Sequence, residues 1–252
     1  MTNVRILTYA THSGGSFDSM MEDARKMDMT VEVVGWGSKW KGYFGKLKDV
    51  KAKVETFDET DIVVVIDGFD TRIRGNTDDI ETLWRTKLNA APIVFSKEPL
   101  HGMGVPSVIQ KYSCYRRFGG MLNAGMYMGT VPALLRLYKD TLQHEQMCRN
   151  DDQCAFNKLV LKHGIVLDDL SWIFNNVPYS KRHVDLKELR GVFCSYPGTL
   201  SWERMKRYPV EYGPIFIPEL VVLSAVVYML STKRILGLRR SVILPSRAAD
   251  AL

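Results

Sequence analysis

The stretch from Asp61 to Asp70 constrains the fold more than any other part of the chain. Residues 62–66 read Ile-Val-Val-Val-Ile, five consecutive β-branched residues. Such a run predicts a strand buried on both faces, as in the parallel sheet of an α/β protein. Asp67-Gly68-Phe69-Asp70 follows directly and places two carboxylates at the carboxyl end of that strand, where open α/β sheets bind ligands. Paired carboxylates there suit Mg²⁺ or Mn²⁺ holding a diphosphate. The alternative is that Asp67 and Asp70 only punctuate a turn.

Strand-like and helix-like segments alternate along the first 180 residues. This order predicts an α/β fold in which helices cover the sheet. The expected strands are 4–9, 30–34, 62–66, 92–96, 126–128 and 165–168, and the expected helices are 17–26, 46–56, 78–87, 132–142 and 152–162. The chain of 252 residues is long enough for one large domain with an appendage. We expect residues 1–208 to form the domain and residues 209–252 to form a separate tail.

Charge and cysteine content narrow the class of protein. Residues 181–252 hold 12 Lys and Arg but 6 Asp and Glu, which accounts for the whole net charge of +6. A nucleic-acid-binding protein would more often carry a basic stripe on its main domain, so we expect no nucleic-acid partner. The four cysteines show no metal-ligand spacing and are expected to be reduced packing residues. The first six residues lack the long apolar region of a signal peptide. A cytoplasmic location is therefore expected.

The tail contains an apolar segment from Tyr212 to Thr232 with basic residues on its carboxyl side. From Ile215 to Thr232 a helix would span about 27 Å, roughly the thickness of a hydrocarbon core. A basic flank beside an apolar segment is typical of attachment to a membrane surface. Pro218 and Glu219 interrupt the segment and favour the alternative, a buried C-terminal helix of the domain. Of the two interpretations we prefer a hydrophobic helix associated with a membrane.

Eight segments, in one order, resemble the glycosyltransferase domain of the procollagen lysyl hydroxylase/glycosyltransferase family, which is of GT-A type. They are 8–11, 36–40, the Gly-rich stretch ending at Lys46, 67–70, 95–98, 122–129, 151–153, and Asp168 with Phe174-Asn175. The resemblance implies a Rossmann-like GT-A fold, with a mixed, mostly parallel sheet flanked by helices. It also implies transfer of a hexose, glucose or galactose, from a UDP-sugar to a hydroxyl acceptor, with Mn²⁺ or Mg²⁺ as cofactor. The acceptor could be a glycan, a protein or a lipid-linked molecule.

The resemblance also assigns roles to individual residues. Asp67 and Asp70 would bind the metal, and Asp151 and Asp152 would face the donor sugar and the acceptor as catalytic residues. The residues expected to bind the nucleotide sugar are Thr11, Trp40, Lys46, Phe69, Glu98, Asn123 and Gly125. Several of these residues have a structural alternative. Lys46 could be a solvated helix residue, the two aromatic rings could be core residues, and the Asp151-Asp152 pair could simply cap a helix.

The chain departs from the family at one point. A histidine near the end of the family's domain completes the metal site, and Ser195 falls where we would expect it. Cys194, Ser195 and His183 are the replacements that the sequence offers. Since Mg²⁺ and Mn²⁺ accept water in place of a protein ligand, activity remains compatible with this change. A second hypothesis is therefore a catalytically weak or inactive relative that binds a nucleotide sugar at a membrane.

Overall fold

The computed structural model describes residues 3–98, 121–177, 183–196, 224 and 228. The chain divides into two units, Met1–Gly198 and Thr199–Leu252, and the helices and strands given below all belong to the first. The apolar segment from Tyr212 to Thr232 lies outside the described residues except for Ser224 and Tyr228. Within the described part of the chain, no helix has the length and apolar character needed to cross a membrane. Membrane attachment through this segment stays a prediction.

A six-stranded sheet forms the centre of the first unit, with the strand order β2-β1-β3-β6-β5-β7. Its strands are β1 (Val4–Tyr9), β2 (Val31–Val34), β3 (Ile62–Asp67), β5 (Ile93–Lys97), β6 (Leu122–Thr130) and β7 (Val166–Asp168). β1 pairs in parallel with β2 and β3, and β5 pairs in parallel with β7. β6 runs antiparallel to both of its neighbours, β3 and β5. The sheet is therefore mixed and mostly parallel, as expected.

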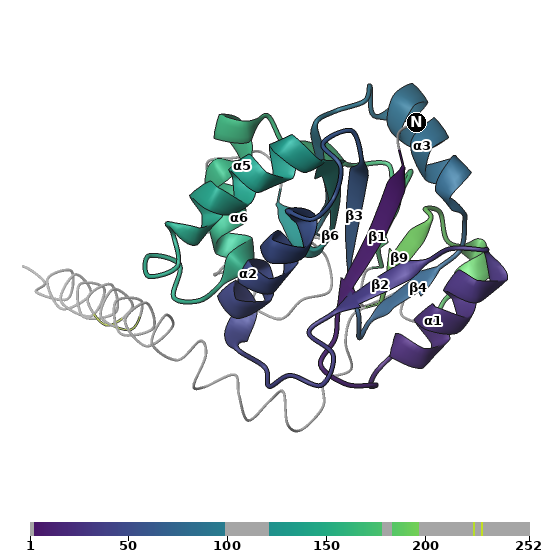
Figure 1. Ribbon diagram of the computed structural model, residues 1–252, viewed down its shortest axis with the longest axis horizontal. Coiled ribbons are helices and arrows are strands. Elements are labelled where there is room, and N and C mark those ends of the chain that lie inside the picture. The colour runs from purple at the N-terminus through teal and green to yellow at the C-terminus, as the bar shows by residue number, and fades with distance from the viewer. Residues whose placement is uncertain (1–2, 99–120, 178–182, 197–223, 225–227, 229–252) are drawn as a thin grey trace, which may run out of the picture. The chain divides into compact units, whose positions relative to one another are not determined.

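Helices cover both faces of this sheet (Figure 1). α2 (Gly42–Val54), α5 (Val131–Leu142) and α6 (Asp152–His163) lie on one face, and α1 (Phe17–Lys26) and α3 (Thr77–Lys87) lie on the other. Side chains alternate between the faces along a strand. Val63 and Val65 of β3 accordingly join the core cluster of α2, α5 and α6, whereas Ile62, Val64 and Ile66 join the opposite cluster. All five side chains are buried, which confirms the expectation of a strand covered on both faces.

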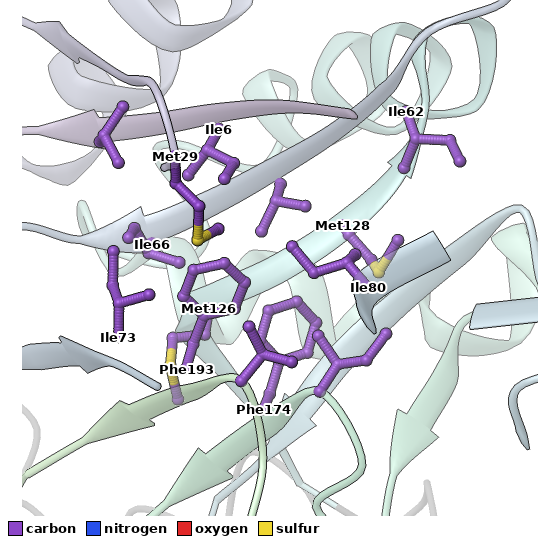
Figure 2. Close-up of a cluster of buried hydrophobic side chains, with 14 of the residues drawn as sticks. Ile6, Met29, Ile62, Ile66, Ile73, Ile80, Met126, Met128, Phe174 and Phe193 are labelled. Atoms are coloured by element: carbon purple, nitrogen blue, oxygen red, sulfur yellow. The ribbon is translucent and has the colours of Figure 1, made fainter. Parts of the chain in front are cut away.

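A second, three-stranded sheet packs on the α1 and α3 side of the core. Its strands are β4 (Thr71–Ile73), β9 (Phe193–Ser195) and β8 (Phe174–Asn176), in that spatial order. Ile73, Phe174 and Phe193 of these strands pack against Met126 and Ile66 of the main sheet (Figure 2). β4 starts immediately after Asp70, and the backbone N–H of Tyr196 donates to the carbonyl of Asp70 at 2.8 Å. The small sheet thus brings the end of the domain against the end of β3.

Two elements differ from their predicted bounds by more than one residue at an end. α2 begins at Gly42 rather than near Lys46, so that Lys46 lies inside the helix instead of at its start. β6 spans Leu122–Thr130, much longer than the predicted strand 126–128. The segment Asn123-Ala124-Gly125 has little strand propensity, and the register of β5 and β6 shifts beside it, between Phe95 and Ser96.

The cysteines in the described part of the chain, Cys148, Cys154 and Cys194, are buried. Their burial agrees with the expectation of packing residues, and their reduced state stays a prediction. Cys114 lies outside the described residues.

Candidate active site

The site is built around residues 67–70, which we call the aspartate turn. In the sheet Asp67 lies opposite Tyr9 of β1, and the preceding Ile66 lies opposite Met126 of β6. The carboxylate of Asp67 accepts a hydrogen bond from the backbone N–H of Phe69 at 3.3 Å, so Asp67 does shape the turn. Both Asp67 and Asp70 are only half-buried. Shaping the turn and presenting carboxylates to a ligand are therefore compatible roles here.

Lys46 is the cationic centre of the site. Its side chain, on α2, is 8% exposed, which rules out the alternative of a solvated helix lysine. Burial alone would lower the pKa of Lys46, but the negative charges of Asp67 and Asp152, with smaller contributions from Tyr43 and Asp70, outweigh it and raise the pKa. Lys46 therefore stays protonated and places a fixed positive charge beside the aspartate turn.

The two acidic residues at the start of α6 have different positions. Asp151 is the N-cap of the helix, and its carboxylate accepts a hydrogen bond from the backbone N–H of Cys154 at 3.0 Å. Asp152 is 6% exposed and lies among charged groups of the site. Burial raises the pKa of Asp152 to about 6, against the opposing charge of Lys46. The capping alternative thus holds for Asp151, while Asp152 is a buried carboxyl group next to Lys46.

A polar network links Glu98, the residue after β5, with β6 and β8. Buried Glu98 accepts hydrogen bonds from the side-chain amides of Asn123, at 2.6 Å, and Asn176, at 3.2 Å. The side-chain oxygen of Asn123 in turn accepts from the backbone N–H of Gly125 at 2.8 Å. A Cβ at Gly125 would lie 2.9 Å from that oxygen and 3.5 Å from the Cβ of Asp67. The network therefore holds the β6 backbone close to the aspartate turn, and a side chain at position 125 would have to displace the Asn123 amide.

Aromatic residues line the β1 and α2 side of the aspartate turn. Trp40 is 47% exposed and packs edge-on against the rings of Tyr9, at 5.8 Å, and Tyr43, at 5.4 Å. Phe69 is half-buried, and its ring centroid lies 5.3 Å from that of His12. The hydroxyl of Thr11 bonds the Nδ1 of His12 at 2.9 Å. Trp40 is therefore no core residue, and Phe69 lies at the edge of the core.

The donor set at the aspartate turn fits a hard cation that keeps several ligands of its own. Asp67 and Asp70 supply carboxylate oxygens, the ligand type that Mg²⁺ and Mn²⁺ prefer. Among residues 3–98, 121–177 and 183–196, no group of three His, Cys, Asp or Glu side chains could hold a metal ion. A cation bound by these two carboxylates would complete its coordination with phosphate oxygens and water.

The three replacements considered for the family's histidine have distinct surroundings. Ser195 is buried on β9 opposite Thr71, the residue that follows Asp70. The thiol of Cys194 is 3.3 Å from the carbonyl of Arg190, and burial raises its pKa to about 12, so it is no thiolate at neutral pH. His183 is exposed. Ser195 is therefore the replacement that lies nearest to the aspartate turn along the paired strands.

Some residues of this region escaped the sequence predictions. His12, Tyr43 and Asn176 carry side chains at the site, but no motif singles them out. Asp168, by contrast, belongs to a motif and has a structural role. It is fully buried, and its carboxylate accepts backbone hydrogen bonds from Trp172 and from the two residues that follow, at 2.7 to 2.9 Å. Asp168 thus fixes the turn that leads into β8.

Comparison with known proteins identifies the family. A family model described as the PLOD GT domain matches residues 1–194. The chain belongs to the PLOD GT domain family. This membership confirms the resemblance found in the sequence and places the chain among glycosyltransferase domains. The matched region contains the aspartate turn, Lys46, the Glu98 network and Asp152, and it ends within β9.

Individual members of the PLOD GT domain family are distant relatives. The chain is 22% identical over 188 residues to a multifunctional procollagen lysine hydroxylase and glycosyltransferase of Caenorhabditis elegans, an alignment that covers 68% of this chain and 25% of the relative. It is 25% identical over 200 residues to procollagen-lysine,2-oxoglutarate 5-dioxygenase 2 of Homo sapiens and of Mus musculus, with 72% of this chain and 26% of each relative covered. The chain therefore spans about a quarter of the length of these relatives.

Proposed function

We propose that the chain is a metal-dependent glycosyltransferase that moves a hexose, glucose or galactose, from a UDP-sugar to a hydroxyl group. The acceptor would be a glycan, a protein or a lipid-linked molecule. The chain is a member of the PLOD GT domain family, and one observation on its structure supports the proposal. Buried Lys46, buried Asp152 and the aspartate turn converge at the carboxyl end of β3. This is the edge at which open α/β sheets bind their ligands.

Transfer from a UDP-sugar requires positive charge beside the diphosphate. The diphosphate is an anion that has to leave, and Asp67 and Asp70 would hold a Mn²⁺ or Mg²⁺ ion beside it. When bound, this ion supplies Lewis-acid stabilisation of the departing diphosphate. Lys46 adds a second positive charge that is built into the fold, and burial strengthens its attraction for a phosphate.

The acceptor hydroxyl has to approach the sugar and lose a proton. Asp152 is the group suited to accept that hydroxyl's hydrogen bond, since a carboxyl group with a pKa of about 6 is mostly ionised at neutral pH yet is a better base than an exposed one. Glu98, Asn123 and Gly125 would position the sugar between Asp152 and the aspartate turn. Trp40, Phe69 and Thr11 would bind the uridine side of the donor.

The proposal is tested by measuring UDP released from UDP-glucose and UDP-galactose, with Mn²⁺ and with a chelator. We expect Mn²⁺-dependent release, reduced at least about 100-fold in Asp67→Asn, since one of two metal-binding carboxylates is removed. Asp28→Asn is the matched control. Asp28 is exposed just after α1 and has a positive φ of 52°, which asparagine tolerates. The Asp28→Asn variant should therefore be as active as the unaltered chain. Absence of metal-dependent turnover in the unaltered chain would refute the proposal.

A second function has a specific observation in its favour. Ser195 stands where the family resemblance leads us to expect a histidine, and the described residues offer no third His, Cys, Asp or Glu beside Asp67 and Asp70. A relative that binds a nucleotide sugar but transfers it slowly, or not at all, fits this pattern. Binding of UDP-sugar with no turnover on a broad acceptor panel would select this second function.

A further inference from the structure

A buried hydroxyl group directly follows the aspartate turn. Thr71, the first residue of β4, is fully buried, and its Oγ1 has no hydrogen-bond partner in the part of the chain that the structure describes. Two other fully buried threonines, Thr8 and Thr141, donate to backbone carbonyls at 3.1 and 2.7 Å. Proteins leave few buried polar atoms unpaired, because folding removes their water without replacing it. The Thr71 hydroxyl is therefore a candidate contact for a bound group.

The pairing of β4 with β9 places a second hydroxyl next to that of Thr71. Thr71 lies directly opposite Ser195, which is also buried, and the side chains of opposed residues are neighbours on one face of a sheet. Since side chains alternate along a strand, Ile73 and Phe193 point to the same face as these two residues. Ile73 and Phe193 pack against the main sheet (Figure 2). The hydroxyls of Thr71 and Ser195 therefore continue this inward face toward the aspartate turn.

This end of the small sheet is tied to Asp70 on both of its strands. Thr71 is the next residue after Asp70 on β4. On the other strand, the backbone N–H of Tyr196, the residue after Ser195, donates to the carbonyl of Asp70 at 2.8 Å. Oδ1 of Asp70 is itself buried. The hydroxyl pair, Thr71 and Ser195, thus adjoins one of the two residues proposed to bind the cation.

We infer that the hydroxyl of Thr71, with that of Ser195 beside it, positions the divalent cation by accepting a hydrogen bond from one of its water ligands. The inference rests on the proposed function, because it concerns the cation held by Asp67 and Asp70. Mg²⁺ and Mn²⁺ keep several waters when carboxylates bind them. A hydroxyl oxygen accepts a hydrogen bond from such a water without adding charge to the site. Groups that hold a metal's ligands in this way set its affinity.

The inference is tested by titrating Mn²⁺ into the chain and following free Mn²⁺ by electron paramagnetic resonance. Thr71→Val removes the hydroxyl and nearly keeps the shape of the side chain. We expect its affinity for Mn²⁺ to fall about 10- to 100-fold, the range found when a group that holds a metal ligand is lost. Thr71→Ser keeps the hydroxyl and should retain most of the affinity. Thr141→Val is the matched control, because it removes a buried hydroxyl on α5 that already has a partner, and its Mn²⁺ affinity should be unchanged.

Thermal unfolding in a chelator adds a measurement that involves no metal. Thr71→Val should melt at least about 2 °C above the unaltered chain, because it removes a buried hydroxyl that has no partner among the described residues. Thr141→Val should show no such gain, since the hydroxyl that it removes is hydrogen-bonded to the carbonyl of Leu137. A residue with a purely structural role would not combine higher stability without metal with weaker binding of Mn²⁺.

Four results would contradict the inference. Unchanged Mn²⁺ affinity in Thr71→Val would refute it while leaving the proposed function intact. A lower melting temperature of Thr71→Val in chelator would also refute it, because the hydroxyl would then be bonded within the fold. If Thr71→Ser bound Mn²⁺ as weakly as Thr71→Val, the hydroxyl would not be the contact. Failure of the unaltered chain to bind Mn²⁺ would overturn the proposed function and, with it, the role of Thr71.

Discussion

Replacing Asp152 by asparagine should stabilise the protein while impairing its activity. The carboxyl group of Asp152 is 6% exposed and lies near Asp151 and Asp67, two further carboxylates. Burial is the largest cause of its raised pKa, and the charge of Lys46 offsets the effect only in part. At pH 7 Asp152 is mostly ionised, although the native state would be more stable if this carboxyl group were uncharged. Asparagine has nearly the same shape and no charge.

The size and pH dependence of the gain follow from the pKa shift. A rise from 3.8 in the unfolded chain to about 6 in the native state corresponds to about 3 kcal/mol at pH 7, at 1.36 kcal/mol per pKa unit. Between pH 4 and pH 6 the native state retains a proton that the unfolded chain has released. Ionised Asp152 therefore destabilises the fold increasingly as the pH rises through this window. The advantage of Asp152→Asn should be about 3 kcal/mol at pH 7 and less than about 1 kcal/mol at pH 4.

Urea unfolding at 25 °C, followed by tryptophan fluorescence at both pH values, measures this difference. Asp151→Asn is the matched control. Asparagine caps a helix as well as aspartate does, and Asp151 is less buried than Asp152. The free energy of unfolding of the Asp151→Asn variant should therefore change by less than about 0.5 kcal/mol. Two results would contradict the claim that the buried charge of Asp152 destabilises the fold. One is an Asp152→Asn variant no more stable than the unaltered chain at pH 7, and the other is an equal gain in stability at pH 4. An active Asp152→Asn would separately contradict the proposed role of Asp152 at the acceptor.

Two further predictions concern single side chains. Asp168→Ala leaves three backbone N–H groups without their acceptor, and we expect at least about 3 kcal/mol of lost stability in urea unfolding. Asp169→Ala, which removes only an exposed ion pair with Lys97, should cost less than about 1 kcal/mol; similar losses in both would contradict the structural role of Asp168. Lys46→Met should weaken Mn²⁺-dependent UDP binding at least about tenfold in calorimetry, whereas Lys48→Met, at an exposed position that pairs with Glu145, should leave it unchanged. Unaltered affinity in Lys46→Met would place the diphosphate elsewhere.

The parts of the fold with strong local signals were predictable from the sequence. β3 is a run of β-branched residues, and β1, α1 and α3 have clear periodicity and clear ends, so their predicted bounds agree closely with the structure. β4, β8 and β9, of three residues each, were missed. Such short strands become stable only through pairing with distant parts of the chain. Their hydrophobic residues, such as Phe193, do not form a pattern long enough to recognise.

In the candidate site, too, local motifs were predictable from the sequence, whereas features that depend on tertiary contacts were not. The aspartate turn and the acidic pair at α6 were readable as motifs, but which member of the pair is buried depends on tertiary packing. Two glycines near a lysine normally indicate a loop, so the sequence predicted a helix that starts only near Lys46. α2 instead begins at Gly42, and Lys46 lies about one turn inside it. His12 had no sequence signal, since the contact of its ring with Phe69 arises only in the folded chain.

In the function that we propose, Asp67 and Asp70 bind UDP through a shared divalent cation. Titration of UDP into the chain with Mn²⁺, repeated with a chelator and with Asp67→Asn, tests it most directly. We expect saturable binding with Mn²⁺ that weakens at least about tenfold both in chelator and in the variant, since either change removes the link between the carboxylates and the diphosphate. UDP binding of equal strength under all three conditions would contradict the claim.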